Sequence, residues 1–395
     1  MHFLSDKFII VGAGLAGTLM AWELEKRGVI YEVWDAPAKT TEKTREKTPS
    51  SKPSQNKASQ VAAGMFNPVS FKRLVEVWNA REHMDVMLST YREIETFLNL
   101  PGKILRTAPI MRVFPNVQYR ELWEKRINEN HNVAQFLAPV SDNAPDDIIA
   151  PHGFGVVPGA GWVDLPLLLD SFREFIEVEG RFVEKVWAQG EKANFSKKTS
   201  SKLTPEKQIE TPHIIDCRGI GAGEDLAKIN LKIQADHGEI LTLKSEINTN
   251  NMCVNKVKWL LPRGNDTFKL GATYKWNVED SIPTQSGRDD LLNSIKPIIE
   301  SKIFDNFEII GHNTGLRPAS KDRRPYAGKI STSSTSSTSS TTYVLNGFGT
   351  RGVLIGPATA ANLANFIFDD VELPSEINVE RYSPPRDLND SLDRG

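Results

Sequence analysis

The sequence has few cysteines, no long apolar run and almost no net charge. Only Cys217 and Cys253 occur in 395 residues, so we expect no disulfide framework and a reducing compartment. No apolar run approaches the roughly 20 residues that span a bilayer. A formal net charge of -2 gives no overall attraction to a nucleic-acid backbone, although a local basic patch remains compatible with it. Cysteine-rich or histidine-rich metal spacing is also absent, and we expect no metal.

The beginning of the chain also lacks the features of a signal peptide. It opens Met1-His2-Phe3-Leu4 and reaches an apolar run by Phe8, which leaves no room for a charged start and an apolar middle. We therefore expect a cytoplasmic protein. The composition, 39% apolar and 25% charged, is that of an ordinary folded protein, and the length suffices for two domains.

Helix and strand patterns are intermixed along the whole chain, as in an α/β fold. Helical periodicity is expected at 19–27, 75–98, 165–176 and 358–368. Strand-like runs occupy 8–11, 29–34, 104–114, 213–217, 239–243, 257–262, 267–273 and 343–346. Two tracts differ from the rest: residues 37–57 predict a solvated loop with an excess of Lys and Arg over Glu, and the Ser/Thr tract 331–342 predicts an elongated turn.

The first strand run leads into a glycine-rich turn that indicates a nucleotide site. Gly12 allows a tight turn, Gly14 lets the backbone approach a pyrophosphate, and Gly17 lets the following helix pack closely on the strand. The amino terminus of that helix then faces the phosphates. Asp35 ends the next run, where a carboxylate can accept hydrogen bonds from ribose hydroxyls. This pattern predicts dinucleotide binding but does not choose between NAD and FAD.

Three further segments carry a resemblance to one family. They are Ala58-Ser59-Gln60-Val61-Ala62-Ala63-Gly64-Met65, then Gly315-Leu316-Arg317-Pro318 with Pro325-Tyr326-Ala327-Gly328, and finally Asn346-Gly347-Phe348-Gly349-Thr350-Arg351-Gly352 with the residues up to Ala360. Together with the glycine turn they resemble the D-amino-acid oxidase superfamily, and most of all glycine oxidases. The resemblance covers nearly the whole chain.

The resemblance implies an α/β fold with a discontinuous, Rossmann-like FAD-binding domain. That domain would comprise residues 1–80, 150–222 and 311–395. A substrate domain, built on a mixed and largely antiparallel sheet, would be interleaved with it as residues 81–149 and 223–310.

The resemblance also implies which residues hold FAD. No cysteine stands between Gly311 and Leu316, where sarcosine oxidases attach their flavin, so the FAD should be non-covalent. Val186 would lie near the adenine, and the backbone of 348–354 would meet the flavin ring. The full set of implied contacts is Gly12, Gly14, Leu15, Ala16, Gly17, Asp35, Ala36, Ser59, Ala63, Gly64, Met65, Val186, Cys217, Gly219, Gly347, Phe348, Gly349, Thr350, Arg351, Gly352, Val353 and Leu354.

Arg317 would bind the substrate carboxylate, with Trp259 and Tyr274 as pocket walls and Thr350 and Arg351 nearby. A planar guanidinium suits that role because it can bind a carboxylate with two hydrogen bonds. Two positions depart from glycine oxidases: Trp259 replaces a tyrosine, and Thr350 replaces a second arginine, with Arg351 one place later. The Arg-Gly order is instead similar to the oxidase domain of the bacterial enzyme that processes carboxymethylaminomethyl-uridine in tRNA.

The implied activity is oxidation of the carbon–nitrogen bond of an amino acid or related amine. A hydride would pass from the Cα–H to flavin N5, and the resulting imine would hydrolyse. Two alternatives stay open: a tRNA carboxymethylaminomethyl-uridine oxidoreductase, and a non-catalytic flavoprotein subunit of a dehydrogenase. A plain NAD-dependent dehydrogenase is disfavoured, because it has no use for the segments around Arg317 and Phe348. The particular amine, the electron acceptor and the oligomeric state stay open.

Overall fold

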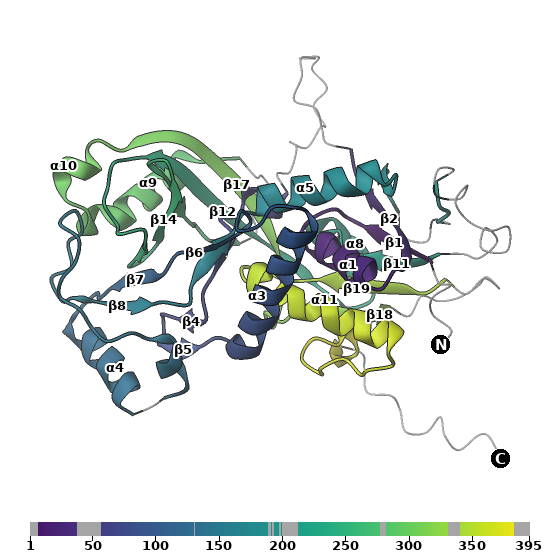
Figure 1. Cartoon of the computed structure of the whole chain (residues 1–395), viewed down its shortest axis with the longest axis horizontal. Coiled ribbons are helices and arrows are strands. Elements are labelled where there is room, and N and C mark those ends of the chain that lie inside the picture. Colours follow the sequence, from purple (N-terminus) through teal and green to yellow (C-terminus); the bar gives the residue numbers. More distant parts are fainter. Residues whose placement is uncertain are drawn as a thin grey trace.

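The computed structural model contains two main sheets (Figure 1). It describes residues 7–37, 57–129, 131–188, 191, 193–196, 199, 212–276, 282–330 and 340–382. Most of the tract 37–57 and most of the tract 331–342 lie outside these ranges. The predicted solvated loop and the predicted elongated turn therefore fall outside the described residues. Within the described ranges, no helix is long and apolar enough to cross a membrane.

The first sheet has six strands in the order β10-β2-β1-β11-β19-β18. All of its pairings are parallel except β18 with β19. The strands are β1 Lys7–Val11, β2 Ile30–Asp35, β10 Phe182–Glu184, β11 His213–Asp216, β18 Tyr326–Ile330 and β19 Thr342–Asn346. This arrangement brings together strands that are far apart in sequence, as a discontinuous nucleotide domain requires.

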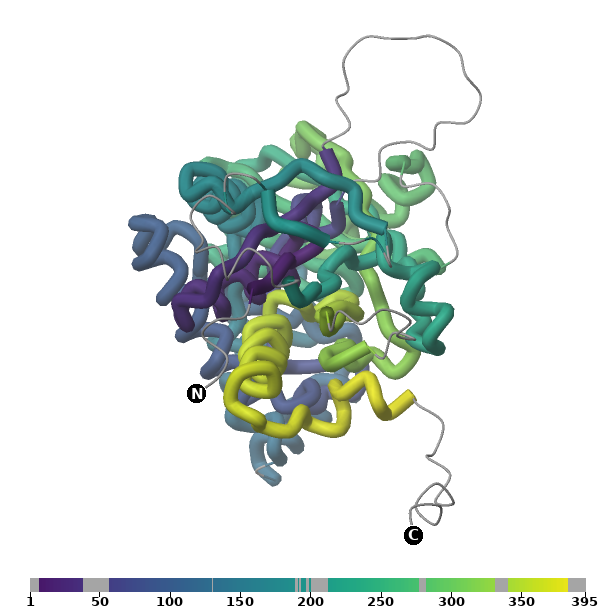
Figure 2. The backbone as a smooth tube through the Cα atoms, turned by 90° about the vertical axis from the view of Figure 1, so that its right-hand side faces the viewer, coloured from purple at the N-terminus to yellow at the C-terminus, as the bar shows by residue number. Residues whose placement is uncertain are grey.

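Each face of this sheet is covered separately because side chains alternate along a strand. Phe8 and Ile10 point into the largest core cluster, whereas Ile9 and Val11 pack with Trp34 on the other face. Four helices contribute to the largest cluster and bury their apolar sides there; among them, α11 packs against α1 (Figure 1). Figure 2 shows α11 as the yellow helix next to the purple amino-terminal part of the chain. The four helices are α1 Leu15–Lys26, α3 Ala80–Phe97, α5 Leu165–Val178 and α11 Gly352–Phe368.

The second sheet has eight strands, in the order β16-β12-β15-β14-β13-β7-β8 with β17 paired to β12. Only the β13–β7 pair is parallel, so the sheet is mixed and largely antiparallel, as predicted. Its strands are β7 Ile110–Val113, β8 Phe154–Val157, β12 Ile233–Lys244, β13 Cys253–Asn255, β14 Trp259–Gly264, β15 Thr267–Gly271, β16 Lys275–Trp276 and β17 Glu308–Ser320. The division into five domain segments stays a prediction.

Smaller elements complete the described part of the chain. The short strands are β3 Met65–Phe66, β4 Val69–Ser70, β5 Val75–Glu76, β6 Leu105–Thr107 and β9 Gly161–Val163. The remaining α-helices are α2 Ala58–Val61, α4 Val117–Asn128, α8 Gly223–Ala227, α9 Gln285–Ile295 and α10 Ser301–Phe304. Short 3-10 turns occur at Asn132–Phe136, Gly219–Ala222, Lys296–Ile298 and Val379–Tyr382.

Several predicted boundaries are wrong, and tertiary pairing explains two of them. The helix expected over 75–98 begins only at Ala80, because Val75–Glu76 pairs with β4 instead. The strand expected over 104–114 is two strands, β6 and β7, which belong to different sheets. Both errors come from partners that local periodicity does not reveal.

The last helix begins at Gly352, six residues before the predicted start, and contains Pro357. Proline lacks the amide that would bind the carbonyl four residues earlier, here that of Val353. The hydroxyl of Tyr91 donates to this carbonyl at 3.2 Å, and the Tyr91 side chain is fully buried. Helix α3 thus supplies the hydrogen bond that the proline removes from α11.

A fully buried carboxylate fixes helix α9 to strand β12. Glu239 accepts hydrogen bonds from the Thr284 amide and the Thr284 hydroxyl, both at 2.8 Å, and its Oε2 lies 2.9 Å from His312 Nε2. Thr284 is also the amino-terminal cap of α9. Because a buried carboxylate without partners is costly, this network ties three elements to one side chain.

We predict that Glu239→Ala lowers the free energy of unfolding by about 3 kcal/mol, because the partly buried donors on Thr284 and His312 lose their acceptor. Denaturant unfolding followed by circular dichroism measures the change. The matched control is Glu308→Ala, at an exposed position at the start of β17. Equal stability of the two variants would contradict the role given to Glu239.

Candidate functional site

The glycine turn lies where strands β1, β2 and β11 end together. Gly12 has a φ of 105°, and a Cβ there would lie 2.7 Å from the carbonyl oxygen of Cys217. The Gly12 amide donates to the carbonyl of Trp34 at 2.7 Å. A Cβ on Gly17 would collide with the carbonyl oxygen of Gly12. Both positions therefore require glycine for reasons of backbone contact.

The amino terminus of α1 is open toward a polar side chain. Gly14 precedes the helix, and a Cβ added to it would meet only the Ser59 hydroxyl within 4 Å, at 3.5 Å. The Leu15 amide donates to Ser59 Oγ at 3.2 Å. An oxygen acceptor at a helix amino terminus matches the place a phosphate oxygen takes in such turns. This geometry fits a pyrophosphate group.

Asp35 lies at the end of β2, buried, with its carboxylate paired to the ammonium of Lys57. Its backbone carbonyl accepts from the Lys185 amide at 2.8 Å, which places the exposed Val186 next in sequence beside this strand end. Ala36 is exposed. The acid predicted for the ribose and the residue predicted for the adenine thus lie at one edge of the sheet.

The segment of small residues connects the two sheets. Gly64 has a φ of 74°, and a Cβ there would collide with the Val163 carbonyl oxygen. The carbonyl of buried Ala63 accepts from Arg263 of β14 at 3.2 Å, and Met65 pairs with Trp162. Because Ala63 and Gly64 have small side chains or none, their backbone atoms make these contacts with β9 and β14 directly.

A second glycine turn precedes α11. Gly347 and Gly349 have φ values of 77° and 55°, and the Asn346 side chain donates to the Gly219 carbonyl at 2.9 Å. The first amides of α11, which begins at Gly352, have no partner within the helix and form its positive end. Backbone amides in this position can stabilise negative charge on the edge of an aromatic ring bound next to them.

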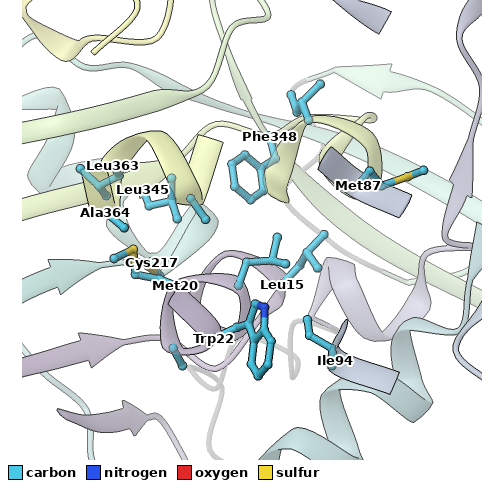
Figure 3. Close-up of a cluster of buried hydrophobic side chains, with 14 of the residues drawn as sticks. Leu15, Met20, Trp22, Met87, Ile94, Cys217, Leu345, Phe348, Leu363 and Ala364 are labelled. Carbon is cyan, nitrogen blue, oxygen red and sulfur yellow. The ribbon is translucent and has the colours of Figure 1, made fainter. Parts of the chain in front are cut away.

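The Phe348 side chain points away from this turn and into the core (Figure 3). It is 8% exposed and lies against Gly352 and Gly356, where added Cβ atoms would be 3.1 and 3.2 Å from it. The side chains of Val353 and Leu354 are buried in the same cluster. Any contact of these residues with a cofactor must therefore come from their backbone.

Arg317 lies on β17 directly over the backbone of Gly238, where a Cβ would collide with the guanidinium. Nη1 of Arg317 is 3.3 Å from Oδ2 of Asp236, its register partner on β12. The Gly349 amide donates to the carbonyl of the next residue, Pro318, at 2.7 Å. The guanidinium is therefore held over β12, and the backbone that follows it is joined to the turn that precedes α11.

The two predicted pocket walls differ in position. The Tyr274 ring lies 4.9 Å from the Arg317 guanidinium and 5.8 Å from the Lys258 ammonium, and 54% of the residue is exposed. Trp259 is half-buried on β14 with its indole against Gly271. Register places Gly271 between Trp259 and Ile240. Tyr274 therefore contacts Arg317, and Trp259 lies farther along the same sheet.

Three arginines gather at the edge of the Arg317 site. Thr350 and Arg351 are exposed, and partial burial of the guanidinium followed by the charges of Arg324 and Arg323 lowers the pKa of Arg351. The Arg324 guanidinium lies 4.3 Å from the Trp78 ring centroid. Sequence reasoning does not select Asp236, Arg323 or Arg324. The motif around Arg317 contains the two arginines, but only strand pairing reveals Asp236.

Among the residues that the structure describes, no group of three or more histidine, cysteine, aspartate or glutamate side chains could hold a metal ion. Both cysteines are free and buried, and burial raises the pKa of each thiol. Neither thiol is poised as a nucleophile.

The chain belongs to a family of flavin enzymes. The family model described as DAO, FAD dependent oxidoreductase, matches residues 7–366. FAD is therefore the cofactor, and the prediction of family and cofactor is confirmed.

Solved structures of low sequence identity share the fold. Glycine oxidase from Bacillus cereus superposes with a TM-score of 0.69 at 16% identity, covering 93% of this chain and 98% of that one. Iminodiacetate oxidase from Chelativorans sp. superposes with a TM-score of 0.67 at 20% identity, covering 95% and 98%. The predicted fold class is confirmed by this likeness and by the two sheets.

A longer protein is similar in sequence. The tRNA 5-methylaminomethyl-2-thiouridine biosynthesis bifunctional protein MnmC of Legionella pneumophila is 23% identical over 414 residues, which cover 98% of this chain. The chain spans 58% of the length of that relative.

We predict that Gly17→Ala abolishes FAD retention, because the added Cβ collides with the Gly12 carbonyl and moves α1 off the strand. The flavin absorbance of the purified protein measures retention, and circular dichroism checks folding. Gly159→Ala is the control, because a Cβ there meets nothing within 4 Å. Normal flavin content in a folded Gly17→Ala protein would place the cofactor elsewhere.

Proposed function

We propose that this protein oxidises the carbon–nitrogen bond of an amino acid or related amine that carries a carboxylate. The observation that carries the proposal is the position of Arg317. Its guanidinium lies over Gly238, and the next residue, Pro318, is hydrogen-bonded to the turn before α11. A carboxylate held there would place its neighbouring carbon near the positive end of α11.

The residues of this chain would bind and orient the substrate. FAD would supply the acceptor for the hydride that leaves the substrate carbon. Arg317 would bind the carboxylate with its planar guanidinium. Tyr274 would cover the guanidinium, and Trp259 would limit the length of the pocket along the sheet. Productive orientation of bound groups accounts for much of the rate in such reactions.

The cofactor would be held without a covalent bond, because residues 311–316 contain no cysteine. Ser59, Leu15 and Gly14 would meet the pyrophosphate, Asp35 the ribose and Val186 the adenine. Backbone atoms of residues 63–65 and 347–354 would meet the ring system. The family resemblance implies these assignments, and they are supported by the Leu15–Ser59 hydrogen bond and by the positions of Asp35 and Lys185 at one edge of the sheet.

We predict that Arg317→Ala raises the apparent dissociation constant of the substrate about 100-fold while FAD content stays normal, because charged hydrogen bonds to the carboxylate are lost. Anaerobic absorbance titration with glycine, sarcosine, proline and D-amino acids identifies the amine that bleaches the flavin and then measures its binding. The control is Arg92→Ala, an exposed arginine on α3.

Unchanged affinity in Arg317→Ala would leave Arg317 as a structural partner of Asp236. A flavin that no amine bleaches in the unaltered protein would instead favour a non-catalytic flavoprotein subunit.

A second candidate is oxidation of a carboxymethylaminomethyl group on a tRNA base. The relative named for tRNA 5-methylaminomethyl-2-thiouridine biosynthesis aligns with 98% of this chain, which supports it. The group of Arg323, Arg324 and Arg351 at the edge of the site supports it as well, because clustered guanidinium groups bind phosphates. Such a substrate also carries a carboxylate beside a secondary amine, as Arg317 requires.

If tRNA is the substrate, we predict salt-sensitive binding that depends on this arginine group. The double variant Arg323→Ala/Arg324→Ala should lower the slope of log affinity against log salt by about two, because two phosphate contacts are lost. Fluorescence anisotropy with labelled tRNA measures it, with Arg92→Ala as control. Binding that is weak at every salt concentration and equal in both variants would exclude this candidate.

A further inference from the structure

We propose that Asp236 binds the ammonium group of the substrate beside Arg317 and accepts its proton. This inference rests on the proposed function and adds the residue that prepares the amine for oxidation. In the step, an N–H bond of the ammonium breaks and an O–H bond forms on Asp236, leaving a neutral amine. Only a neutral amine has the lone pair that assists hydride departure from the adjacent carbon.

The first argument is the environment of the Asp236 carboxylate. The residue is 2% exposed. Its Oδ2 lies 3.3 Å from Arg317 Nη1, whereas its Oδ1 is buried and has no hydrogen-bond partner among the residues that the structure describes. A carboxylate that served only to hold Arg317 would be expected to use both oxygens in a bidentate pair. One buried acceptor oxygen therefore lacks the donor that a buried carboxylate requires.

Asp236 also lies on the same face of the sheet as the Arg317 guanidinium. Asp236 and Gly238 alternate with His237 along β12 and so share one face of the sheet. The Arg317 guanidinium lies over Gly238 on that face. In an α-amino acid or an N-substituted glycine, a single carbon separates the carboxylate from the amine. A substrate whose carboxylate is bound by Arg317 therefore brings its amine within a few bond lengths of Asp236.

Three groups act on the charge of Asp236: Arg317 from β17, Arg323 from the turn after β17, and His237 from its own strand. Burial raises the pKa of Asp236, and these three groups oppose the shift. Burial also lowers the pKa of His237, which keeps that ring neutral near pH 7. A carboxylate with a raised pKa is a better proton acceptor than an exposed one.

The test is the pH dependence of kcat/KM in Asp236→Asn, an isosteric change that keeps an oxygen for Arg317. In the unaltered enzyme the rate should be level near neutrality and fall as pH drops and Asp236 takes up a proton. In the variant the amine must lose its proton to solvent. The rate should be about 100-fold lower at pH 7 and recover above the pKa of the free amine.

A structural role gives a different result: the variant would lose activity equally at all pH values, through a raised KM. That outcome, or an unchanged profile, overturns the proposal. The control is Asp266→Asn, an exposed residue in the turn between β14 and β15. Its profile should match that of the unaltered enzyme.

Equilibrium binding gives a readout that is independent of turnover. Acetate carries a carboxylate and no amine, so in the unaltered protein it must compete with Asp236 for Arg317. Asp236→Asn should bind acetate at least about tenfold more tightly, seen as a change in the flavin absorbance spectrum. Equal or weaker binding contradicts the competition and overturns the proposal.

If Asp236→Asn does not retain flavin, the pH dependence of kcat/KM in the unaltered enzyme still tests the role of Asp236. A kcat/KM that rises about tenfold per pH unit through neutrality would show that solvent deprotonates the amine, and Asp236 would have no such role. Absence of flavin reduction by every amine at every pH would instead refute the proposed function itself. The two failures are therefore distinguishable.

Discussion

The pairing of β12 with β17 is the constraint on which the candidate site depends. Twelve register pairs hold these strands together, and they place Asp236 opposite Arg317. The carboxyl end of β17 then meets the turn before α11 through the Gly349–Pro318 hydrogen bond and the Ala319–Phe348 bridge. A shift of one residue in this register would turn Arg317 to the other face of the sheet. The long ladder therefore holds the guanidinium over Gly238 and joins the end of β17 to the turn before α11.

The nucleotide turn can be identified from sequence because its constraints are local. A Cβ on Gly17 would meet the carbonyl of Gly12 only five residues earlier, so the glycine spacing follows from local backbone geometry. The contacts of Gly12 with Cys217 and of Gly14 with Ser59 are long-range, and the spacing does not reveal them. The family resemblance supplies Arg317. Asp236 cannot be found in this way, because its importance comes from a partner on another strand. The same reason explains the late start of α3 at Ala80, which depends on the β4–β5 pair.

Pro357 shows how a local rule fails when packing compensates. A proline in a helix pattern predicts a break or a boundary, and the sequence accordingly predicts that the last helix begins after it. In the structure the Val353 carbonyl, which Pro357 leaves free, receives the buried Tyr91 hydroxyl. The helix therefore begins at Gly352, and its positive end lies next to the glycine turn at 347–351.

Charge is distributed unequally between the interior of the site and its edge. Arg317 is balanced by Asp236. In contrast, Arg323, Arg324 and Arg351 form no ion pair with an acid among the residues that the structure describes. A neutral pair in the interior suits a zwitterion, which brings one charge of each sign. An excess of positive charge at the edge raises the local concentration of any anion. Under the proposed function the interior would therefore bind the reacting amine and carboxylate, whereas the arginines at the edge would attract a further negative charge on the substrate.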